Sequence, residues 1–127
     1  MDTWRKMIHA QGGDPDAALP TAAHTHTVTA DADGYLAELD ALSVGVASWR
    51  LGAGRARRQD PVQFGAGIEL HAVKGDKVRA GQPLFSLHTD DEYRFERSLE
   101  VLRDGFTISA EAPARRESVV LERVTAR

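Results

Sequence analysis

The sequence predicts a single α+β domain, and three observations support that prediction. Residues 41–51 and 90–104 carry apolar side chains at helical spacing, and a residue that can cap a helix directly precedes each stretch. Short β-compatible runs lie around these two stretches and are separated by glycine-containing turns. A chain of 127 residues, 42% hydrophobic and 28% charged, is long enough for one modest core and too short for two domains.

Charge and composition exclude several classes of partner. The net charge of −3 disfavours nucleic acid and anionic membranes, because both favour a basic face. No apolar run approaches the roughly 20 residues that span a bilayer, and Asp2 and Arg5 stand where a secretory signal needs an apolar block. The chain has no cysteine, which suits a reducing compartment. We therefore expect a cytoplasmic protein with no nucleic-acid or membrane partner.

The first predicted element is a short helix over residues 3–11. Its apolar residues recur at helical spacing and are Trp4, Met7 and Ile8. The glycines at 12 and 13 close it. An amphipathic helix this short is marginal alone, so we expect residues 1–13 to be the end of a helix that leads in from a missing upstream region. Residues 14–24 then form a proline-containing linker, and residues 25–127 form the domain itself.

Residues 25–39 predict a β-hairpin. Two β-compatible runs flank a turn at residues 31–34, where Gly34 would occupy the left-handed position. The first main helix follows over residues 41–51, with Asp40 as its N-cap and Gly52 as its end. The face that we expect to be buried comprises Leu42, Val46 and Trp49.

The centre of the chain predicts a long loop followed by a compact β unit. Residues 52–67 are rich in glycine and arginine and form the loop. Strands are predicted over residues 68–73, 77–79 and 83–88, joined by turns at Gly75-Asp76 and Gly81-Gln82.

The second main helix is predicted over residues 90–104. Thr89 and Glu92 have the spacing of a capping box, and Gly105 would end the helix. Its buried face is expected to comprise Phe95, Leu99 and Leu102. Strands are predicted over residues 106–109 and 118–124, with a turn at residues 113–116 between them.

Candidate reactive residues are few. His24 and His26 are two apart, which on a strand places both rings on one face, but a third metal ligand is missing. No serine lies in a G-x-S-x-G motif, and no carboxylate pair is placed to separate an acid from a base. We assign no catalytic, cofactor-binding or metal-binding residue.

The glycine-rich loop invites comparison with a phosphate-binding loop, because paired glycines expose backbone N–H groups beside cationic side chains. Such loops run from a strand into a helix, whereas this one follows a helix and ends near a proline. An arginine-rich loop that contacts another domain fits the pattern better. Its candidate residues are Gly52, Gly54, Arg55, Arg57, Arg58 and Asp60.

Four segments together resemble one family. They are M-I-H-A-Q-G-G-D-P at 7–15, D-G-Y-L-A-E-L-D-A-L-S-V-G at 33–45, L-G-A-G-R-A-R-R-Q-D-P at 51–61 and K-G-D-K-V-R-A-G-Q-P-L at 74–84. In this order they are similar to the C-terminal domain of the thymidine and pyrimidine nucleoside phosphorylases. The resemblance extends from about Trp4 to about Ile108, nearly the whole chain.

The resemblance implies an α/β-hammerhead fold, in which a small mixed or antiparallel, barrel-sandwich-like β unit packs with two main helices. It implies that the chain is the non-catalytic C-terminal domain of a pentosyltransferase, whose parent converts thymidine and phosphate to thymine and 2-deoxyribose 1-phosphate. The parent's helical and phosphate-binding domains would be the partners of this domain, in an enzyme expected to be a homodimer. Phosphate is a co-substrate, and no cofactor is implied.

No position in this chain matches the family's phosphate-binding loop of the K-x-S-x-G-G type or its catalytic arginine, serine, lysine and histidine. The chain alone is therefore expected to be inactive, and the choice between thymidine and a broader set of pyrimidine nucleosides stays open. The resemblance also places a substrate-closing hinge between the parent's lobes. We accordingly predict that residues 52–64 are a mobile loop that orders near the mouth of the parent's cleft. The alternative is a surface loop held by an ion pair between an arginine and Asp60.

Two other classes of function remain open at this point. Residues 73–84 have the turn pattern of a biotinyl- or lipoyl-type carrier, although Lys74 and Lys77 lack the methionine neighbours that a carrier lysine usually has. The chain could also be a free-standing interaction module.

Overall fold

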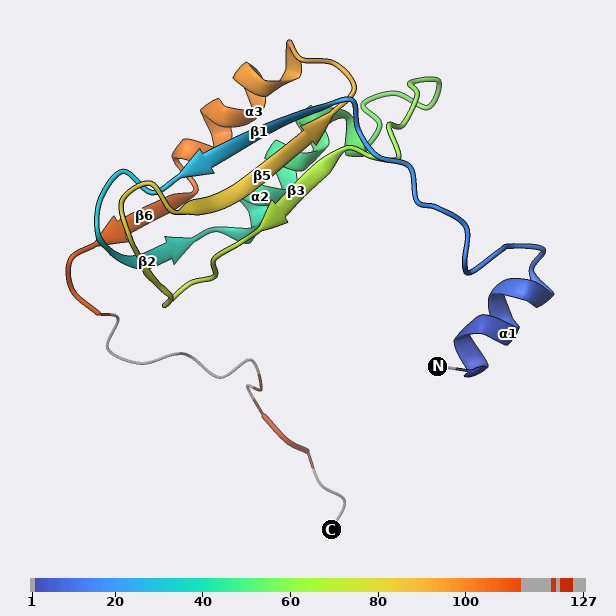
Figure 1. Ribbon diagram of the computed structural model, residues 1–127, viewed down its shortest axis with the longest axis horizontal. Coiled ribbons are helices and arrows are strands. Elements are labelled where there is room, and N and C mark those ends of the chain that lie inside the picture. Colours follow the sequence, from blue (N-terminus) through green and yellow to red (C-terminus); the bar gives the residue numbers. More distant parts are fainter. Residues whose placement is uncertain (1, 113–119, 121, 125–127) are drawn as a thin grey trace.

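The computed structural model describes residues 2–112, 120 and 122–124. Its helical elements are α1 (Asp2–Ala10), α2 (Ala41–Ser48), the helical turn η1 (Trp49–Ala53) and α3 (Arg94–Arg103). Its strands are β1 (His24–Thr29), β2 (Gly34–Leu39), β3 (Gly67–Leu70), β4 (Lys77–Val78), β5 (Pro83–Thr89) and β6 (Phe106–Ser109). This mixture of helices and short strands confirms the α+β prediction (Figure 1).

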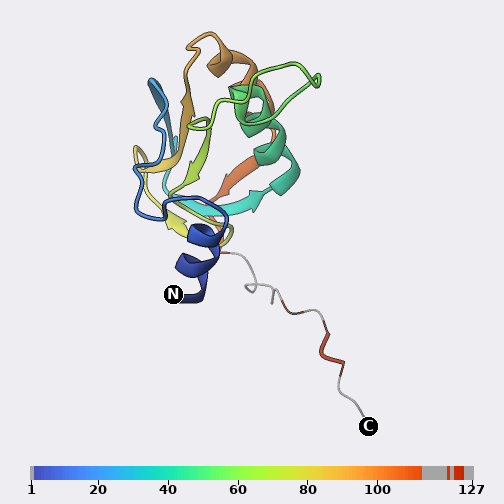
Figure 2. The ribbon, with the colours of Figure 1, turned by 90° about the vertical axis from the view of Figure 1, so that its right-hand side faces the viewer.

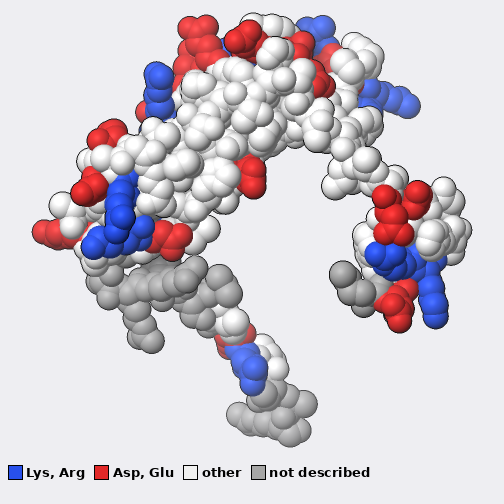
Figure 3. All heavy atoms as spheres, in the orientation of Figure 1, with Lys and Arg blue, Asp and Glu red and all other residues white. Residues whose placement is uncertain are grey.

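The strands form two antiparallel sheets of three strands each. The first has the order β1-β5-β3 and the second the order β4-β2-β6. Helices α2 and α3 contact each other and lie against one face of the first sheet (Figures 1 and 2). Figure 3 shows the other face of this sheet, which α2 and α3 do not cover. Few charged side chains lie over the centre of that face, and most lie along its edges. Within the described residues no helix is long and apolar enough to cross a membrane.

The predicted hairpin over residues 25–39 is wrong, because β1 and β2 belong to different sheets. The segment between them is held by the turn before β5 instead: Ala30 N donates to Gln82 O (2.9 Å), and Gly81 N donates to Ala30 O (2.8 Å). Gly34 does not have a positive φ. Glycine is required there because a Cβ would lie 2.5 Å from Ser109 O on the neighbouring β6. A turn-like sequence therefore serves here to carry the chain from one sheet to the other.

The turns inside the β unit agree with the prediction. Gly75 (φ +96°) and Gly81 (φ +79°) both have the left-handed backbone that glycine adopts most readily. The short strand between them, β4, joins the second sheet, whereas β3 and β5 pair in the first. The chain therefore crosses between the sheets at each of these glycines.

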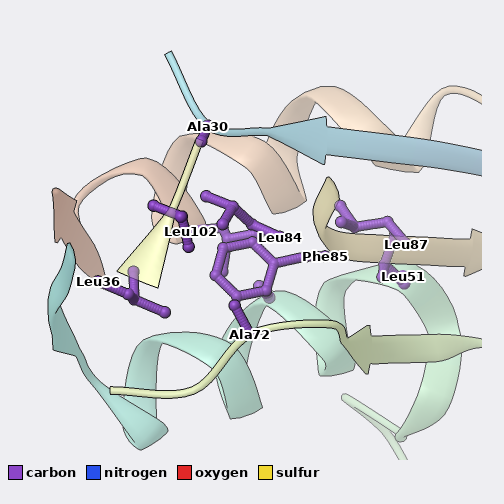
Figure 4. Close-up of a cluster of buried hydrophobic side chains, with 10 residues drawn as sticks. Ala30, Leu36, Leu51, Ala72, Leu84, Phe85, Leu87 and Leu102 are labelled. Atoms are coloured by element: carbon purple, nitrogen blue, oxygen red, sulfur yellow. The ribbon is translucent and has the colours of Figure 1, made fainter. Parts of the chain in front are cut away.

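The core lies between the sheets and the two main helices (Figure 4). Strand β5 contributes more buried positions than any other described strand, with Leu84, Phe85 and Leu87 fully enclosed. The buried apolar residues are Ala30, Leu36, Ala47, Leu51, Ala72, Val78, Leu84, Phe85, Leu87 and Leu102. Phe85 also meets Phe106 edge to face, with ring centroids 5.2 Å apart. This contact joins the first sheet to the second.

The buried face predicted for the first main helix is largely wrong. Leu42 is 74% exposed, and Trp49 is also exposed, whereas Val46 is half-buried. The fully buried residues of this stretch are Ala47 and Leu51, and Val44 packs against the core half-buried. Because apolar residues surround nearly the whole of α2, two different faces have helical spacing and the sequence does not choose between them.

The face predicted for the second main helix is confirmed. Leu102 is buried, and Phe95 and Leu99 pack half-buried against the core. The small residue Ser98 is also fully buried, and its Oγ donates to Ala47 O (2.9 Å). This hydrogen bond joins α3 to α2.

The two predicted helix starts have opposite outcomes. Asp40 caps α2 as predicted, because its Oδ2 accepts from Ser43 N (2.8 Å) and Ser43 Oγ (2.7 Å). These hydrogen bonds lower the pKa of Asp40. The capping box at Thr89 and Glu92 is wrong, since α3 begins only at Arg94 and its N-cap position makes no side-chain hydrogen bond. Thr89 is instead the buried last residue of β5.

The two chain ends differ in how far they agree with the prediction. Helix α1 is followed by Gly12 (φ +81°), whose N–H donates to His9 O (3.0 Å), so the glycine end is confirmed. Helix α1 has no buried residue and stands apart from the sheets (Figures 1 and 2). The predicted turn at 113–116 lies outside the described residues, and so do residues 118, 119 and 121 of the predicted strand at 118–124. The other four residues of that prediction are described and are not in a strand, so the predicted strand is wrong there.

The burial of Leu102 predicts that its side chain stabilises the folded domain. Leu102→Ala should lower the free energy of unfolding by about 2–5 kcal/mol, because the side chain is 1% exposed and its removal leaves a cavity. Leu42→Ala, the matched control, should change it by less than about 0.5 kcal/mol. Urea unfolding followed by circular dichroism measures both, and equal losses in the two variants would contradict the assignment.

Candidate interaction site around the glycine-rich loop

The glycine-rich loop leaves η1 at Gly52 and reaches β3 at Gly67. Gly52 has a φ of +111°, and a Cβ on it would lie 2.8 Å from the side chain of Gln63. At Gly54 a Cβ would lie 2.7 Å from Cδ1 of Trp49. Both predicted glycines are thus explained by the close approach of a neighbouring side chain.

Asp60 stabilises a turn within the loop. Its Oδ2 accepts from Arg57 N (2.8 Å), and Asp60 N donates to Arg57 O (3.0 Å). The carboxylate therefore bonds the backbone of Arg57. Among the described residues the guanidinium groups of Arg55, Arg57 and Arg58 form no ion pair, with Asp60 or with any other carboxylate. The loop presents three cationic side chains that are exposed.

A pocket of about 420 Å³ lies between the loop and the start of α3. It combines three arginines with two aromatic rings. Its lining residues are Trp49, Arg50, Gly52, Gly54, Ala56, Asp60, Pro61, Tyr93, Arg94 and Arg97. Of the six predicted loop residues, Gly52, Gly54 and Asp60 line this pocket, and the loop arginines do not.

The pocket is lined by three arginines that were not predicted from the sequence, and the three predicted loop arginines do not line it. Arg94 and Arg97 are three apart and therefore share a face of α3. Arg50 reaches them from η1 because α2 and α3 pack together. The helical spacing of the pair was a signal in the sequence, but its meeting with Arg50 depends on the tertiary fold.

Two of the three pocket arginines already have carboxylate partners. Arg50 Nη1 donates to Arg97 O (2.6 Å) and lies 3.6 Å from Glu100 Oε2. Arg94 Nε donates to Asp91 Oδ2 (2.8 Å). The hydrogen bond from Arg94 lowers the pKa of Asp91, and in return raises that of Arg94. Because carboxylates engage these cations, the pocket is a mixed aromatic and ion-paired surface.

The histidines do not gather into a metal site. His24 and His26 are exposed on β1 as predicted, and the His26 ring lies 5.5 Å from that of Phe95. His88 on β5 is hydrogen-bonded through Nδ1 to Thr25 Oγ1 on the neighbouring strand β1 (3.1 Å). In the described part of the chain no three histidine, aspartate or glutamate side chains are close enough together to hold a metal ion.

One serine and one histidine are in contact. Ser86 Oγ lies 2.7 Å from Nε2 of His71. A catalytic pair of this kind needs a third group that orients the histidine, and no described carboxylate bonds His71. Ser86 is also buried in the middle of β5. We interpret the contact as a structural hydrogen bond between neighbouring segments of the sheet.

The two lysines considered for a biotinyl- or lipoyl-type carrier lie in and directly after a tight turn. Asp76 N donates to Val73 O (3.0 Å) and closes the turn that contains Lys74. Lys77 is paired with Tyr35 in the second sheet. The described geometry therefore leaves only Lys74 at a turn.

Comparison with known proteins gives a consistent result. Residues 35–109 match the family model of the pyrimidine nucleoside phosphorylase C-terminal domain. The chain is 43% identical over 120 residues to a thymidine phosphorylase of Mycobacterium tuberculosis, an alignment that covers 94% of this chain and 28% of the relative. It is 34% identical over 119 residues to a pyrimidine-nucleoside phosphorylase of Bacillus subtilis, covering 90% of this chain and 27% of the relative. With an AMP phosphorylase of Thermococcus kodakarensis it shares 35% identity over 127 residues, which is 95% of this chain and 23% of the relative.

The chain thus spans less than a third of the length of these relatives and matches their C-terminal part. The matched family region contains β2, α2, the glycine-rich loop, β5, α3 and β6. The chain therefore belongs to the pyrimidine nucleoside phosphorylase C-terminal domain family.

Proposed function

We propose that this chain serves as the non-catalytic C-terminal domain of a thymidine (pyrimidine nucleoside) phosphorylase. The parent converts thymidine and phosphate to thymine and 2-deoxyribose 1-phosphate, without a cofactor. The observation that carries the proposal is the identity of 43% to the Mycobacterium tuberculosis thymidine phosphorylase over 94% of this chain.

The composition of the site supports a non-catalytic role. Arg50 and Arg94 at the pocket bond carboxylates and backbone carbonyls, and the contact between Ser86 and His71 lacks an orienting carboxylate among the described residues. Phosphorolysis requires groups that bind phosphate and stabilise the leaving base. On this proposal those groups belong to the helical and phosphate-binding domains of the parent.

The names of the relatives bear on the substrate. Similar C-terminal parts occur in relatives named for thymidine, for pyrimidine nucleosides and for AMP. We infer that the choice of substrate lies with the other domains. Thymidine is our choice for the parent because the identity to the thymidine phosphorylase is 43%, compared with 35% to the AMP phosphorylase.

Exposed apolar side chains fit contact with other domains of the parent. Trp4 and Met7 of α1 are exposed, and Phe64 beside the loop is 85% exposed. Apolar side chains that gather on one exposed face, as Trp4 and Met7 do at helical spacing, often mark a surface that contacts other protein. We propose that the helical and phosphate-binding domains cover them, in a homodimeric and cytoplasmic parent.

The loop has a role in this proposal. Arg55, Arg57 and Arg58 would face the mouth of the parent's cleft and help to close it over substrate. Functional loops commonly combine a fixed base with exposed side chains, and the loop has both features.

The first test uses the chain alone. Purified chain incubated with thymidine and phosphate should release no thymine above background, because the groups for phosphorolysis are absent. Release of thymine is followed by absorbance, and a preparation from a host without its own phosphorylase is the control. Phosphate-dependent turnover that co-purifies with the chain would refute the proposal.

The second test concerns the loop in the complete enzyme. Replacing Arg55, Arg57 and Arg58 together by alanine should raise KM for nucleoside or slow closure while leaving the melting temperature unchanged. Steady-state kinetics and thermal unfolding measure the two effects.

A matched control removes the same charge elsewhere, by alanine at Lys74, Lys77 and Arg79. These exposed residues lie on the β unit, away from the loop. Equal kinetic effects in both triple variants would show that only net charge matters. Unchanged kcat and KM in the loop variant would remove its proposed role.

A further inference from the structure

Gln63 occupies the point where the glycine-rich loop returns to the domain. Its backbone N–H donates to Gly52 O (3.0 Å), so a hydrogen bond closes residues 52–63 within the 52–67 loop. This segment therefore has the closed base of an Ω-type loop. Gly52 and Gln63 are also in close contact, since a Cβ on Gly52 would lie 2.8 Å from Cδ of Gln63.

The side-chain amide of Gln63 connects this base to the start of α3. Its Oε1 accepts from Asp90 N (2.9 Å), and its Nε2 donates to Asp91 Oδ2 (2.7 Å). Asp91 in turn accepts from Arg94 Nε (2.8 Å) in the first turn of α3. The oxygen of the Gln63 amide thus accepts a hydrogen bond, and its nitrogen donates one.

Thr89 completes the connection at the end of β5. Its fully buried hydroxyl donates to Leu51 O (2.7 Å), immediately before Gly52, and lies 3.0 Å from Gln63 Oε1. No buried side-chain polar atom in the described residues lacks a hydrogen-bond partner. The cluster is therefore fully satisfied, which makes the loss of a single donor costly.

We propose that Gln63 is the positioning residue of the loop. Its amide fixes the base of the loop to β5 and α3, and so determines where Arg55, Arg57 and Arg58 are presented. The inference concerns the fold of this chain and does not depend on the proposed phosphorylase function. If that function holds, the arginines close the cleft from a fixed base, and only the part of the loop beyond the base changes position.

The amide chemistry of Gln63 is specific. A glutamate has the same shape and keeps the acceptor for Asp90 N, but it loses the donor to Asp91 and places a second carboxylate beside it. Gln63→Glu should therefore release the base. In the double variant with Asp91→Asn, the roles of donor and acceptor are exchanged, and the new Nδ2 can donate to the new carboxylate. Because Asp91 Oδ2 also accepts from Arg94 Nε, the Asp91→Asn change removes that second hydrogen bond, and Asp91→Asn alone is the control for its loss.

Amide hydrogen exchange of the 127-residue chain at neutral pH tests the proposal. The local probes are the amides of Arg57, Asp60 and Gln63, which are hydrogen-bonded within the loop. The reference is the amides of β5. Gln63→Glu should lower the protection of the loop amides by about tenfold to a hundredfold and leave β5 unchanged.

Two variants make the result decisive. Gln59→Glu, the same chemical change at an exposed loop position, should leave all protection factors as in the wild type. Gln63→Glu with Asp91→Asn should restore protection of the loop to within about threefold of Asp91→Asn alone, which lacks the Arg94 hydrogen bond in the same way.

Three results would overturn the proposal: wild-type protection of the loop in Gln63→Glu, an equal loss in β5 and the loop, or no recovery in the double variant. If Gln63→Glu does not fold, the double variant decides. A folded and protected double variant supports the exchange of roles, and an unfolded one refutes it.

Discussion

The structure depends on the burial of β5. This strand is the centre of the first sheet, with β1 on one side and β3 on the other, and its residues Leu84, Phe85 and Leu87 form the middle of the core. The helices α2 and α3 pack on the same sheet, and the T-shaped contact of Phe85 with Phe106 reaches the second sheet. A small domain has only one core of this kind, so the packing of the two sheets with α2 and α3 is organised around this strand.

The same strand also determines the geometry of the loop. Thr89, the last residue of β5, is buried and bonds Leu51 O at the end of the helical segment from which the loop emerges. Gln63 bonds the residues that follow Thr89. Core packing thereby fixes the base of the loop, while Arg55, Arg57 and Arg58 stay exposed. A rigid base with exposed cations suits a domain that contributes a contact surface to an enzyme.

Local signals in the sequence were reliable, and choices that depend on distant contacts were not. The cap at Asp40, the helix end at Gly52 and the turns at Gly75 and Gly81 follow from short-range chemistry, and the sequence predicted them. The hairpin at residues 25–39 was wrong because the pairing of β1 with β5 is decided by burial of the sheet, far along the chain. The capping box at Thr89 was wrong because the hydroxyl bonds Leu51 O instead.

The candidate site could be predicted only in part, for the same reason. Glycine and arginine content identified the loop, and the family resemblance indicated its setting. The pocket depends on Arg50 meeting Arg94 and Arg97, which requires the packing of α2 on α3. Since α2 is apolar on nearly all sides, its sequence does not fix the face that packs. The role of Gln63 likewise needs the tertiary contact with Asp91.

We propose that this chain completes a phosphorylase whose chemistry lies in other domains. A chimera tests it most directly: the C-terminal part of the Mycobacterium tuberculosis thymidine phosphorylase is replaced by this chain, which aligns with 28% of that relative at 43% identity. Phosphate-dependent release of thymine is then compared between the chimera and the relative truncated at the same point. The account predicts that the chimera regains activity well above that of the truncated enzyme. A folded chimera with no more activity than the truncated enzyme would contradict it.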